Sequence, residues 1–211
     1  MTQNKNQFNI VIVGTGGQGL ITLLQVLAEA AVFSGLDIKT SELHGLSQRG
    51  GSVEVHIRFG KKIYSPLVAQ GEADLVIALE MQESLRAAYF ASSKTAFLIN
   101  KHVVPVPLQT SFTEDQISKI LLGVTRKIEF VSASEICQKE IGTSVVAGVY
   151  LVGLGASRGL IPFKNDLILK AIKKVIPEKY FELNRRAFDL VKNLSENLGS
   201  RYAQTKNYDK K

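Results

Sequence analysis

A glycine-rich turn with the composition of a phosphate-binding loop stands near the start of the chain. An apolar run over residues 8–13 leads directly into Gly14-Thr15-Gly16-Gly17-Gln18-Gly19. Glycine has no Cβ and takes positive φ angles, so the amides of such a turn can approach a phosphate at the positive end of the following helix. The turn therefore has the pattern of a nucleotide-binding strand-to-helix unit.

The turn departs from the dinucleotide-binding fingerprint. Three of its glycines have the expected spacing, but Gly17 is additional and Gln18 brings a long amide side chain into the turn. The fingerprint also has an acid about 20 residues further on, which binds the ribose hydroxyls. Glu42 is the candidate for that acid, and no neighbouring residue supports it. A turn of this kind also occurs where a strand and a helix simply pack closely, so both interpretations stay open.

A second string of polar residues and glycines follows the second expected strand: Ser41-Glu42-Leu43-His44-Gly45-Leu46-Ser47-Gln48-Arg49-Gly50-Gly51. Its place is the carboxyl edge of the sheet, where open α/β folds bind ligands. We expect it beside the first glycine turn. Together the two strings could form one anion-binding crevice, in which Arg49 supplies a charged fork and the loop amides form a nest.

Two other chemistries are disfavoured by spacing. His44, His56 and His102 do not have the i, i+4 spacing of metal ligands, so no metal site is predicted. Ser47 lies three residues from His44, but a nucleophile and its base also need an orienting acid and an oxyanion pocket. Glu42 fits neither role by spacing, so hydrolase chemistry is not expected.

Strand patterns of two kinds must position these strings. The run over residues 8–13 and the short apolar runs at 73–79, 95–99 and 128–131 are typical of buried strands. Residues 53–59 instead alternate apolar and polar side chains, which indicates one solvated face. Gly60-Lys61-Lys62 then predicts an antiparallel hairpin toward residues 63–64. A further strand is expected near residues 37–42.

Helix signals lie between these strands. We expect a helix over residues 19–33, closed by Gly35, and another near 82–91. Thr113 with Gln116, and Ser132 with Glu135, have the spacing of capping boxes. The remaining helices are expected at the following places: residues 143–157, where glycines 148, 153 and 155 suggest close packing; after Asn165 as a cap, ending before Pro177; and 180–198, ended by Gly199.

These elements predict an α/β fold, a three-layer, mostly parallel Rossmann-like sheet with an antiparallel hairpin and a helical C-terminal lobe. No internal repeat or low-complexity linker divides the chain. We therefore expect a single domain over residues 1–199 and a basic tail over residues 200–211.

Composition fits one domain of ordinary size. The 211 residues are 45% hydrophobic, which is enough for a core, and no apolar run reaches the roughly 18 residues of a membrane span. The polar N-terminus lacks the features of a secretory signal. A single cysteine, Cys137, excludes an internal disulfide and a multi-cysteine cluster on this chain. It could be activated near a helix start, but a buried structural role is favoured. A cytoplasmic location is expected.

The net charge of +7 is unevenly distributed. From Lys164 onward the chain has 12 Lys and Arg residues against 6 Asp and Glu. A basic lobe of this kind can face an acidic partner or phosphates, although charge runs usually form a solvated helix face. No aromatic platform accompanies the charges, so nucleic-acid binding is not expected.

The two strings, together with Tyr64-Ser65-Pro66-Leu67, Ala73-Asp74 and Glu182-Leu183-Asn184-Arg185-Arg186-Ala187-Phe188, resemble the gamma-type domain of 2-oxoacid:ferredoxin oxidoreductases. The resemblance runs from about residue 8 to Val191. The His-Gly-x-x-Gln-Arg-Gly-Gly string resembles the indolepyruvate branch most closely, at its beta subunit. Ser47, where relatives often have a smaller residue, and the tail after Gly199 depart from the family pattern.

This resemblance implies a subunit of a larger enzyme. The implied reaction is the oxidative decarboxylation of indolepyruvate or another aryl-2-oxoacid with coenzyme A, which gives an aryl-acetyl-CoA, carbon dioxide and reduced ferredoxin. The resemblance places thiamine diphosphate and the iron-sulfur clusters in a large partner subunit. One cysteine agrees with that, because it cannot hold a four-cysteine cluster.

The same resemblance implies a noncatalytic role for this chain. The crevice is expected to face coenzyme A or the partner's active site, and its residues are Gly14, Gly16, Gly17, Gln18, Gly19, His44, Ser47, Gln48, Arg49, Gly50 and Gly51. The alternative is a stand-alone module that binds NAD(P) or a flavin and acts in redox chemistry or sensing.

Overall fold

Six strands form one sheet in the computed structural model, which describes residues 7–45, 50–105 and 110–205. The strand order is β2-β3-β1-β4-β5-β6. The strands are β1 (Gln7–Thr15), β2 (Asp37–His44), β3 (Ser52–Gly60), β4 (Leu75–Ala78), β5 (Ala96–Asn100) and β6 (Ile128–Val131). Strands β1, β4, β5 and β6 run parallel, whereas β3 is antiparallel to both β1 and β2. The predicted fold class is confirmed.

The predicted hairpin has a different partner. Residues 63–64 are not in a strand, and β3 instead forms its antiparallel pairs with β2 and β1. Because these two strands occupy both edges of β3, no edge is left for residues 63–64. Side chains hold this segment instead, since the Asp37 carboxylate accepts a hydrogen bond from the backbone N–H of Ile63.

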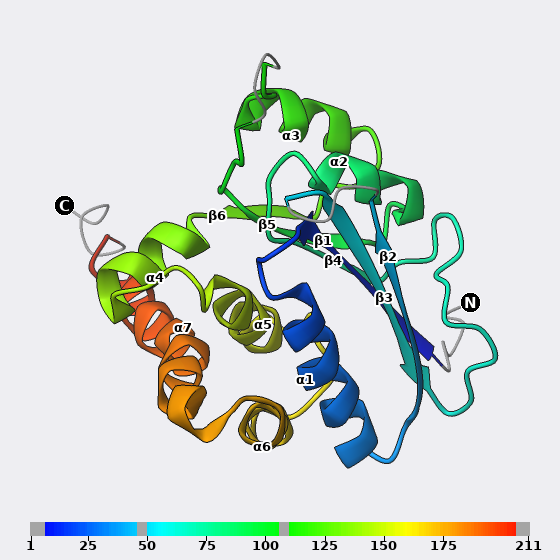
Figure 1. Cartoon of the computed structure of the whole chain (residues 1–211). Helices are drawn as coiled ribbons and strands as arrows, with labels where there is room; N and C mark the ends of the chain where they lie inside the picture. The colour runs from blue at the N-terminus through cyan, green and yellow to red at the C-terminus, as the bar shows by residue number, and fades with distance from the viewer. Residues whose placement is uncertain (1–6, 46–49, 106–109, 206–211) are drawn as a thin grey trace.

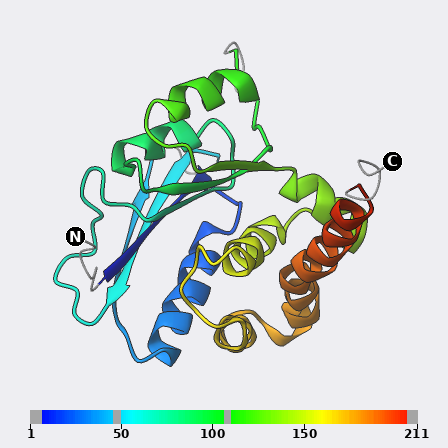
Figure 2. The ribbon, with the colours of Figure 1, turned by 180° about the vertical axis from the view of Figure 1, so that it is seen from behind.

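Helices cover both faces of the sheet (Figures 1 and 2). One layer contains α1 (Leu20–Phe33), α4 (Ala133–Ile141), α5 (Ala147–Ser157), α6 (Asn165–Val175) and α7 (Glu178–Thr205). The other contains α2 (Ser84–Ala87), η1 (Ala88–Phe90) and α3 (Glu114–Leu122). Residues 10–13 of β1 are all apolar because the strand is buried on both faces. Ile10 and Ile12 pack into one core, and Val11 and Val13 pack into the other.

The glycines of α5 are sites of close packing, as predicted. A Cβ on Gly148 would lie 2.8 Å from a methyl group of Leu23 on α1. A Cβ on Gly153 would lie 2.7 Å from the backbone oxygen of Phe188 on α7. The glycines therefore let α5 sit between α1 and α7 at distances that a larger residue does not permit.

The predicted helix ends are correct in part. Thr113 and Gln116 form the complete capping box of α3, and Gly35 has a φ of 71° after α1. Ser132 makes no side-chain cap bond, because its ψ of 51° leaves it outside the extended conformation of a normal N-cap. Asn165 is the first residue of α6, so Lys164 occupies the cap position instead.

Gly199 does not end the last helix, since α7 runs to Thr205. A glycine inside a helix costs only about 1 kcal/mol, which does not by itself stop it. No helix within the described ranges is long and apolar enough to cross a membrane.

Candidate functional site

The glycine turn between β1 and α1 is closed by the side chain of Gln18. Its Oε1 accepts a hydrogen bond from the backbone N–H of Thr15 at 2.8 Å. A Cβ on Gly14 would lie 2.5 Å from that oxygen, so only glycine leaves room for the folded-back amide. The long side chain that departs from the dinucleotide fingerprint thus has a definite place inside the turn.

Two further glycines give the turn its shape. Gly17 has a φ of 96° and Gly19, the N-cap of α1, has a φ of 79°. Side-chain-bearing residues rarely adopt these angles. The turn therefore depends on glycine for its backbone conformation at both positions.

The first turn contacts the end of the second string directly, as predicted. The backbone N–H of Gly16 donates to the carbonyl oxygen of Gly51 at 2.9 Å, and a Cβ on Gly16 would lie 3.4 Å from the nitrogen of Gly50. The N–H of Gly45 donates to the carbonyl oxygen of Ser52 at 2.9 Å and closes the loop at its other side. The two strings thus form one structural unit at the carboxyl edge of the sheet.

The other predicted site residues lie apart from this contact or outside the described residues. His44 ends β2, is exposed, and has its Nε2 3.4 Å from Oε2 of Glu42. It lines none of the three cavities described below. Ser47, Gln48 and Arg49 lie outside the described residues.

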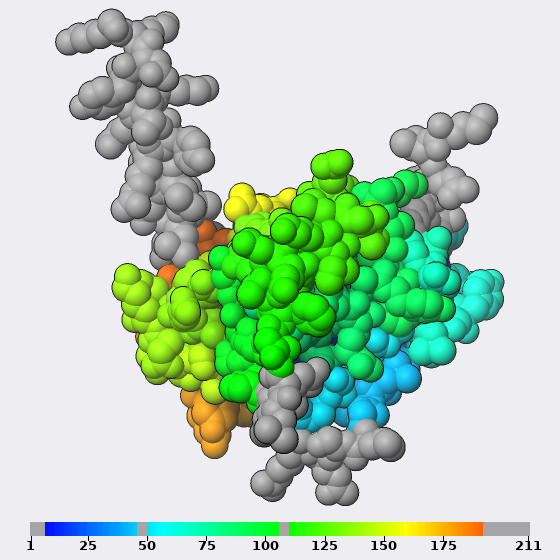
Figure 3. Space-filling model, turned by 90° about the horizontal axis from the view of Figure 1, so that it is seen from above, coloured from blue at the N-terminus to red at the C-terminus, as the bar shows by residue number. Residues whose placement is uncertain are grey.

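A polar cavity of about 430 Å³ adjoins the contact between the two strings. It lies between the end of β1, the start of β3, the segment after β4 and the residues before α3. Figure 3 shows α3 from above, in green. Its hydroxyl and amide groups come from Thr15, Ser52, Gln82, Thr110 and Ser111, and its charged groups from Glu80, Glu83 and Arg86.

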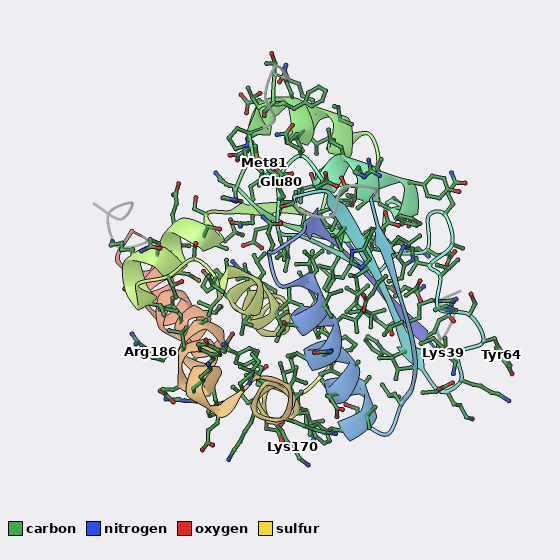
Figure 4. The ribbon with its side chains drawn as sticks, viewed as in Figure 1. Lys39, Tyr64, Glu80, Met81, Lys170 and Arg186 are labelled. Carbon is green, nitrogen blue, oxygen red and sulfur yellow. The ribbon has the colours of Figure 1, made fainter. Side chains whose placement is uncertain are left out.

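Glu80 and Glu83 organise this cavity. Glu80 follows β4 and is only 2% exposed; its carboxylate accepts from the backbone N–H groups of Glu83 at 2.8 Å and Val104 at 3.2 Å. Glu83 in turn accepts from the hydroxyl of Ser52 at 2.7 Å. The two carboxylates therefore tie the segments after β4 and β5 to the start of β3, directly after the second string. Figure 4 shows Glu80 and Met81 at this end of the sheet, beneath α3.

Burial sets the protonation behaviour of Glu80. Removal from water raises the pKa of its carboxyl above the ordinary value, against the lowering effect of the backbone N–H groups around it. Neighbouring Glu83 raises the pKa further. Glu80 is thus harder to ionise in the folded protein than a glutamate in water.

Two more cavities lie on the other side of the glycine turn and share Gln18. One, of about 680 Å³, is mainly apolar and lies between α1, α5 and the start of α7. The other, of about 150 Å³, is lined by polar groups of Asn100, His102, Ser134 and Ser144. Gln18 thus lines both cavities while its Oε1 accepts the hydrogen bond from Thr15.

The turn uses its amides internally rather than presenting all of them to a ligand. The N–H of Thr15 binds Gln18, that of Gly16 binds Gly51, and that of Gln18 donates to the Thr15 oxygen at 3.3 Å. The geometry is that of a joint between two loops, which favours tight packing over dinucleotide binding. Within the described residues, no group of three or more His, Cys, Asp or Glu side chains is placed to hold a metal.

Sequence reasoning missed Glu80, Glu83 and Asn100. The signal was available for two of them: Glu80 comes directly after the apolar run that ends at Leu79, and Asn100 ends β5, so both stand at carboxyl ends of buried strands. Glu83 had no such signal, because its role arises from a contact with Ser52, which is 31 residues away in the chain.

Comparison with known proteins gives a consistent result. The family described as "Pyruvate ferredoxin/flavodoxin oxidoreductase" matches residues 9–194. The "Indolepyruvate oxidoreductase subunit IorB" of Archaeoglobus fulgidus is 38% identical over 189 residues, which are 87% of this chain and 93% of the relative.

Solved structures share the fold. The gamma subunit of a keto/oxoacid ferredoxin oxidoreductase from Geobacter sulfurreducens has a TM-score of 0.65 at 23% identity, over 86% of this chain and 94% of that one. The 2-oxoglutarate:ferredoxin oxidoreductase from Magnetococcus marinus has a TM-score of 0.69 at 18% identity, over 92% of this chain but only 32% of that longer one. The family match spans β1 to α7 and includes both joined glycine strings. This chain therefore belongs to the pyruvate ferredoxin/flavodoxin oxidoreductase family.

Proposed function

We propose that this chain is the small subunit of an indolepyruvate:ferredoxin oxidoreductase. The complex is proposed to convert an aryl-2-oxoacid and coenzyme A to an aryl-acetyl-CoA, carbon dioxide and reduced ferredoxin. The observation that carries the proposal is the 38% identity with the indolepyruvate oxidoreductase subunit over nearly the full length of both chains. The gamma subunit with the same fold supports a role as part of a complex.

The cofactors of the reaction are proposed to belong to the partner. Thiamine diphosphate supplies the chemistry that cleaves the bond to the carboxylate, and iron-sulfur clusters carry electrons to ferredoxin. A four-cysteine cluster does not fit this chain, whose one cysteine, Cys137, is buried in the core. The partner is accordingly a large subunit that carries both groups.

The joined strings are proposed to form a wall of the crevice that faces coenzyme A and the partner's active site. Glycines at both loops keep the backbone close, and the polar cavity beside Gly51 has the volume of a small-ligand site. Its hydroxyl and carboxylate groups can accept hydrogen bonds from the amino and amide groups of coenzyme A. Arg49 is proposed to bind the phosphates as a bidentate fork.

Reconstitution with the large subunit tests this function. Ferredoxin reduction is measured with indolepyruvate, phenylpyruvate and pyruvate, with and without this chain. We expect the highest turnover with an aryl substrate and a loss of turnover when this chain is omitted. Turnover that does not depend on this chain would rule out the subunit role.

Arg49 variants test the crevice separately. Arg49→Ala should raise the KM for coenzyme A at least about tenfold, since one charge-assisted pair contributes roughly 1.5–3 kcal/mol. Arg49→Lys keeps the positive charge but loses the bidentate geometry, so its KM for coenzyme A should lie between those of the wild type and Arg49→Ala. Unchanged turnover and coenzyme A affinity in Arg49→Ala would remove this role.

The alternative of a stand-alone nucleotide module makes a different prediction. Calorimetric titration of the purified chain with NAD, NADP and a flavin nucleotide should then show binding without a partner. The internally paired amides of the glycine turn favour no binding.

A further inference from the structure

The segment between β3 and β4 is irregular but held at four backbone groups. The Asp37 carboxylate accepts from the N–H of Ile63 at 2.8 Å. Arg58 donates from one nitrogen to the carbonyl oxygens of Ser65 at 2.9 Å and Leu67 at 3.0 Å. The Nδ1 of His56 accepts from the N–H of Val68 at 2.9 Å. A stretch of six residues without helix or strand is thus fixed by side chains of β2 and β3.

The side chains that hold this segment are themselves fixed. The other nitrogens of Arg58 donate to Asn9 and Gln7 on β1, both at 3.1 Å. His56 is buried, and its Nε2 lies 2.8 Å from Oε1 of Glu54. Because Nδ1 accepts a hydrogen bond, Nε2 carries the ring proton and donates it to that carboxylate. The backbone of the segment therefore has little freedom.

This fixed backbone presents apolar side chains to solvent. Ile63 and Val68 are buried, but Tyr64 is 83% exposed and Leu67 is 50% exposed. Figure 4 shows Tyr64 at the outer edge of the molecule, pointing away from the sheet. Ile63 and Val68 are the residues of this segment that cover the core. Packing of the core therefore does not require large apolar side chains at Tyr64 and Leu67.

Three lysines accompany these two side chains, one on β2 and two in the residues after β3. The Nζ of Lys62 lies 5.2 Å from the centre of the Tyr64 ring, and Lys61 precedes it. Lys39 pairs with Arg58 across the β2–β3 ladder, so it lies on the face of the sheet that Arg58 uses to reach the segment. The patch, which we define as Lys39, Lys61, Lys62, Tyr64 and Leu67, combines two apolar side chains with three lysines, two of which lie near the carboxylate of Asp37. Three positive charges against one negative charge leave it basic.

We infer that this patch docks onto the large subunit, where Tyr64 and Leu67 enter an apolar depression with an acidic rim. The inference rests on the proposed function. Tyrosine is enriched among the residues that dominate protein interfaces, and a backbone fixed before binding lowers the entropy lost on association. A second copy of this chain is disfavoured as the occupant, since it would bring three lysines against the same three lysines.

Binding of the reconstituted large subunit to variants of the full chain tests the inference. Tyr64→Ala and Leu67→Ala should each weaken the complex about tenfold or more, as hot-spot truncations do. Lys61→Glu with Lys62→Glu should slow association and remove most of its salt dependence. Leu122→Ala, which truncates a leucine of similar exposure on α3, is the matched control and should bind like the wild type.

A further variant tests the residue that holds the backbone of the segment, with the exposed side chains unchanged. Arg58→Lys keeps a positive charge but has one nitrogen in place of three, so it cannot hold the two carbonyls and the β1 side chains at once and should weaken binding while Tyr64 is retained. Circular dichroism and thermal unfolding show whether each variant is folded. A variant that unfolds is replaced by Tyr64→Ser or Leu67→Ser, both at exposed positions.

The outcomes are distinguishable. If the wild-type chain does not bind the large subunit, the proposed function fails. If it binds and the Tyr64 and Leu67 variants bind equally well, only the docking surface is wrong. Two other outcomes also overturn the inference. In one, the variants bind the large subunit like the wild type but change the self-association of the isolated chain. In the other, they bind the large subunit like the wild type but change the retention of RNA by the chain.

Discussion

The backbone N–H of Gly16 donates to the carbonyl oxygen of Gly51, one step beyond the last pair of the β1–β3 ladder, Thr15 with Ser52. The contact between the two loops is thus a continuation of an antiparallel strand pair rather than a chance approach. Because β3 enters the sheet between β2 and β1, the second string must return beside the first turn. The contact between the two strings therefore follows from the strand order.

Gln18 should stabilise the turn through its carbonyl oxygen. Gln18→Ala removes the acceptor of the buried Thr15 N–H and should lower the free energy of unfolding by about 1–3 kcal/mol. Gln18→Glu keeps an acceptor at the same position and adds a favourable negative charge near the start of α1, so it should stay close to wild type. Chemical denaturation of the three proteins is the measurement. Equal stability of the Ala and Glu variants would contradict a role for this hydrogen bond.

Gly153 should be the least replaceable glycine of α5. A Cβ there meets the backbone of Phe188 at 2.7 Å, so Gly153→Ala must displace α7. We expect a loss of about 1–3 kcal/mol despite the better helix propensity of alanine. Gly148→Ala is the matched comparison, because its Cβ meets only the flexible end of Leu23 and should cost less. Thermal unfolding compares them, and a larger loss in Gly148→Ala would contradict the packing argument.

Local patterns predicted most of the fold because they report directly on burial and turns. The apolar run of β1 feeds two cores, the capping box starts α3, and Gly35 ends α1. The proximity of the two glycine strings was also predictable, since both follow strands of one sheet. The hairpin partner of β3 was not, because nothing in the apolar pattern of residues 63–64 shows that the N–H of Ile63 bonds to the Asp37 carboxylate instead of to a neighbouring strand.

The polar cavity shows what sequence patterns leave out. Glu80 can be suspected from its place after a buried strand, but its bond to Val104 joins segments 24 residues apart. The contact between Ser52 and Glu83 likewise depends on how two loops meet in three dimensions. Such contacts have no period or spacing in the chain, so only the folded arrangement reveals them.

Cys137 should behave as an inert core residue. Burial raises the pKa of its thiol to about 11, so very little thiolate is present at pH 8. A thiol reagent at pH 8 should react slowly with the native protein and quickly after unfolding in guanidinium. Since this is the chain's one cysteine, the whole signal reports on it. Fast reaction of the native protein would place the thiol outside the core.

Glu80 should make the free energy of unfolding fall as the pH rises, whereas an ion-paired carboxylate makes it rise. Burial raises its pKa in the folded state, so the folded protein binds more protons than the unfolded one above about pH 4.5, the ordinary value for Glu. Stability from this group is therefore fully present below that pH and is lost as the pH rises through the folded-state pKa. Glu80→Gln removes the titration.

Denaturant unfolding of wild type and Glu80→Gln between pH 4 and 8 measures this effect. Near pH 4 the wild-type group is a neutral carboxylic acid, which like the Gln amide offers one carbonyl oxygen to the two N–H groups, so the two proteins should then have similar free energies of unfolding. As the pH rises, only the wild type loses stability from this group, so Glu80→Gln should become the more stable protein. Glu135→Gln, at an exposed position on α4, is the control and should not gain stability over the wild type in this way. A wild type that becomes more stable than Glu80→Gln as the pH rises would mean that Glu80 stabilises the cavity as a carboxylate, against the burial argument.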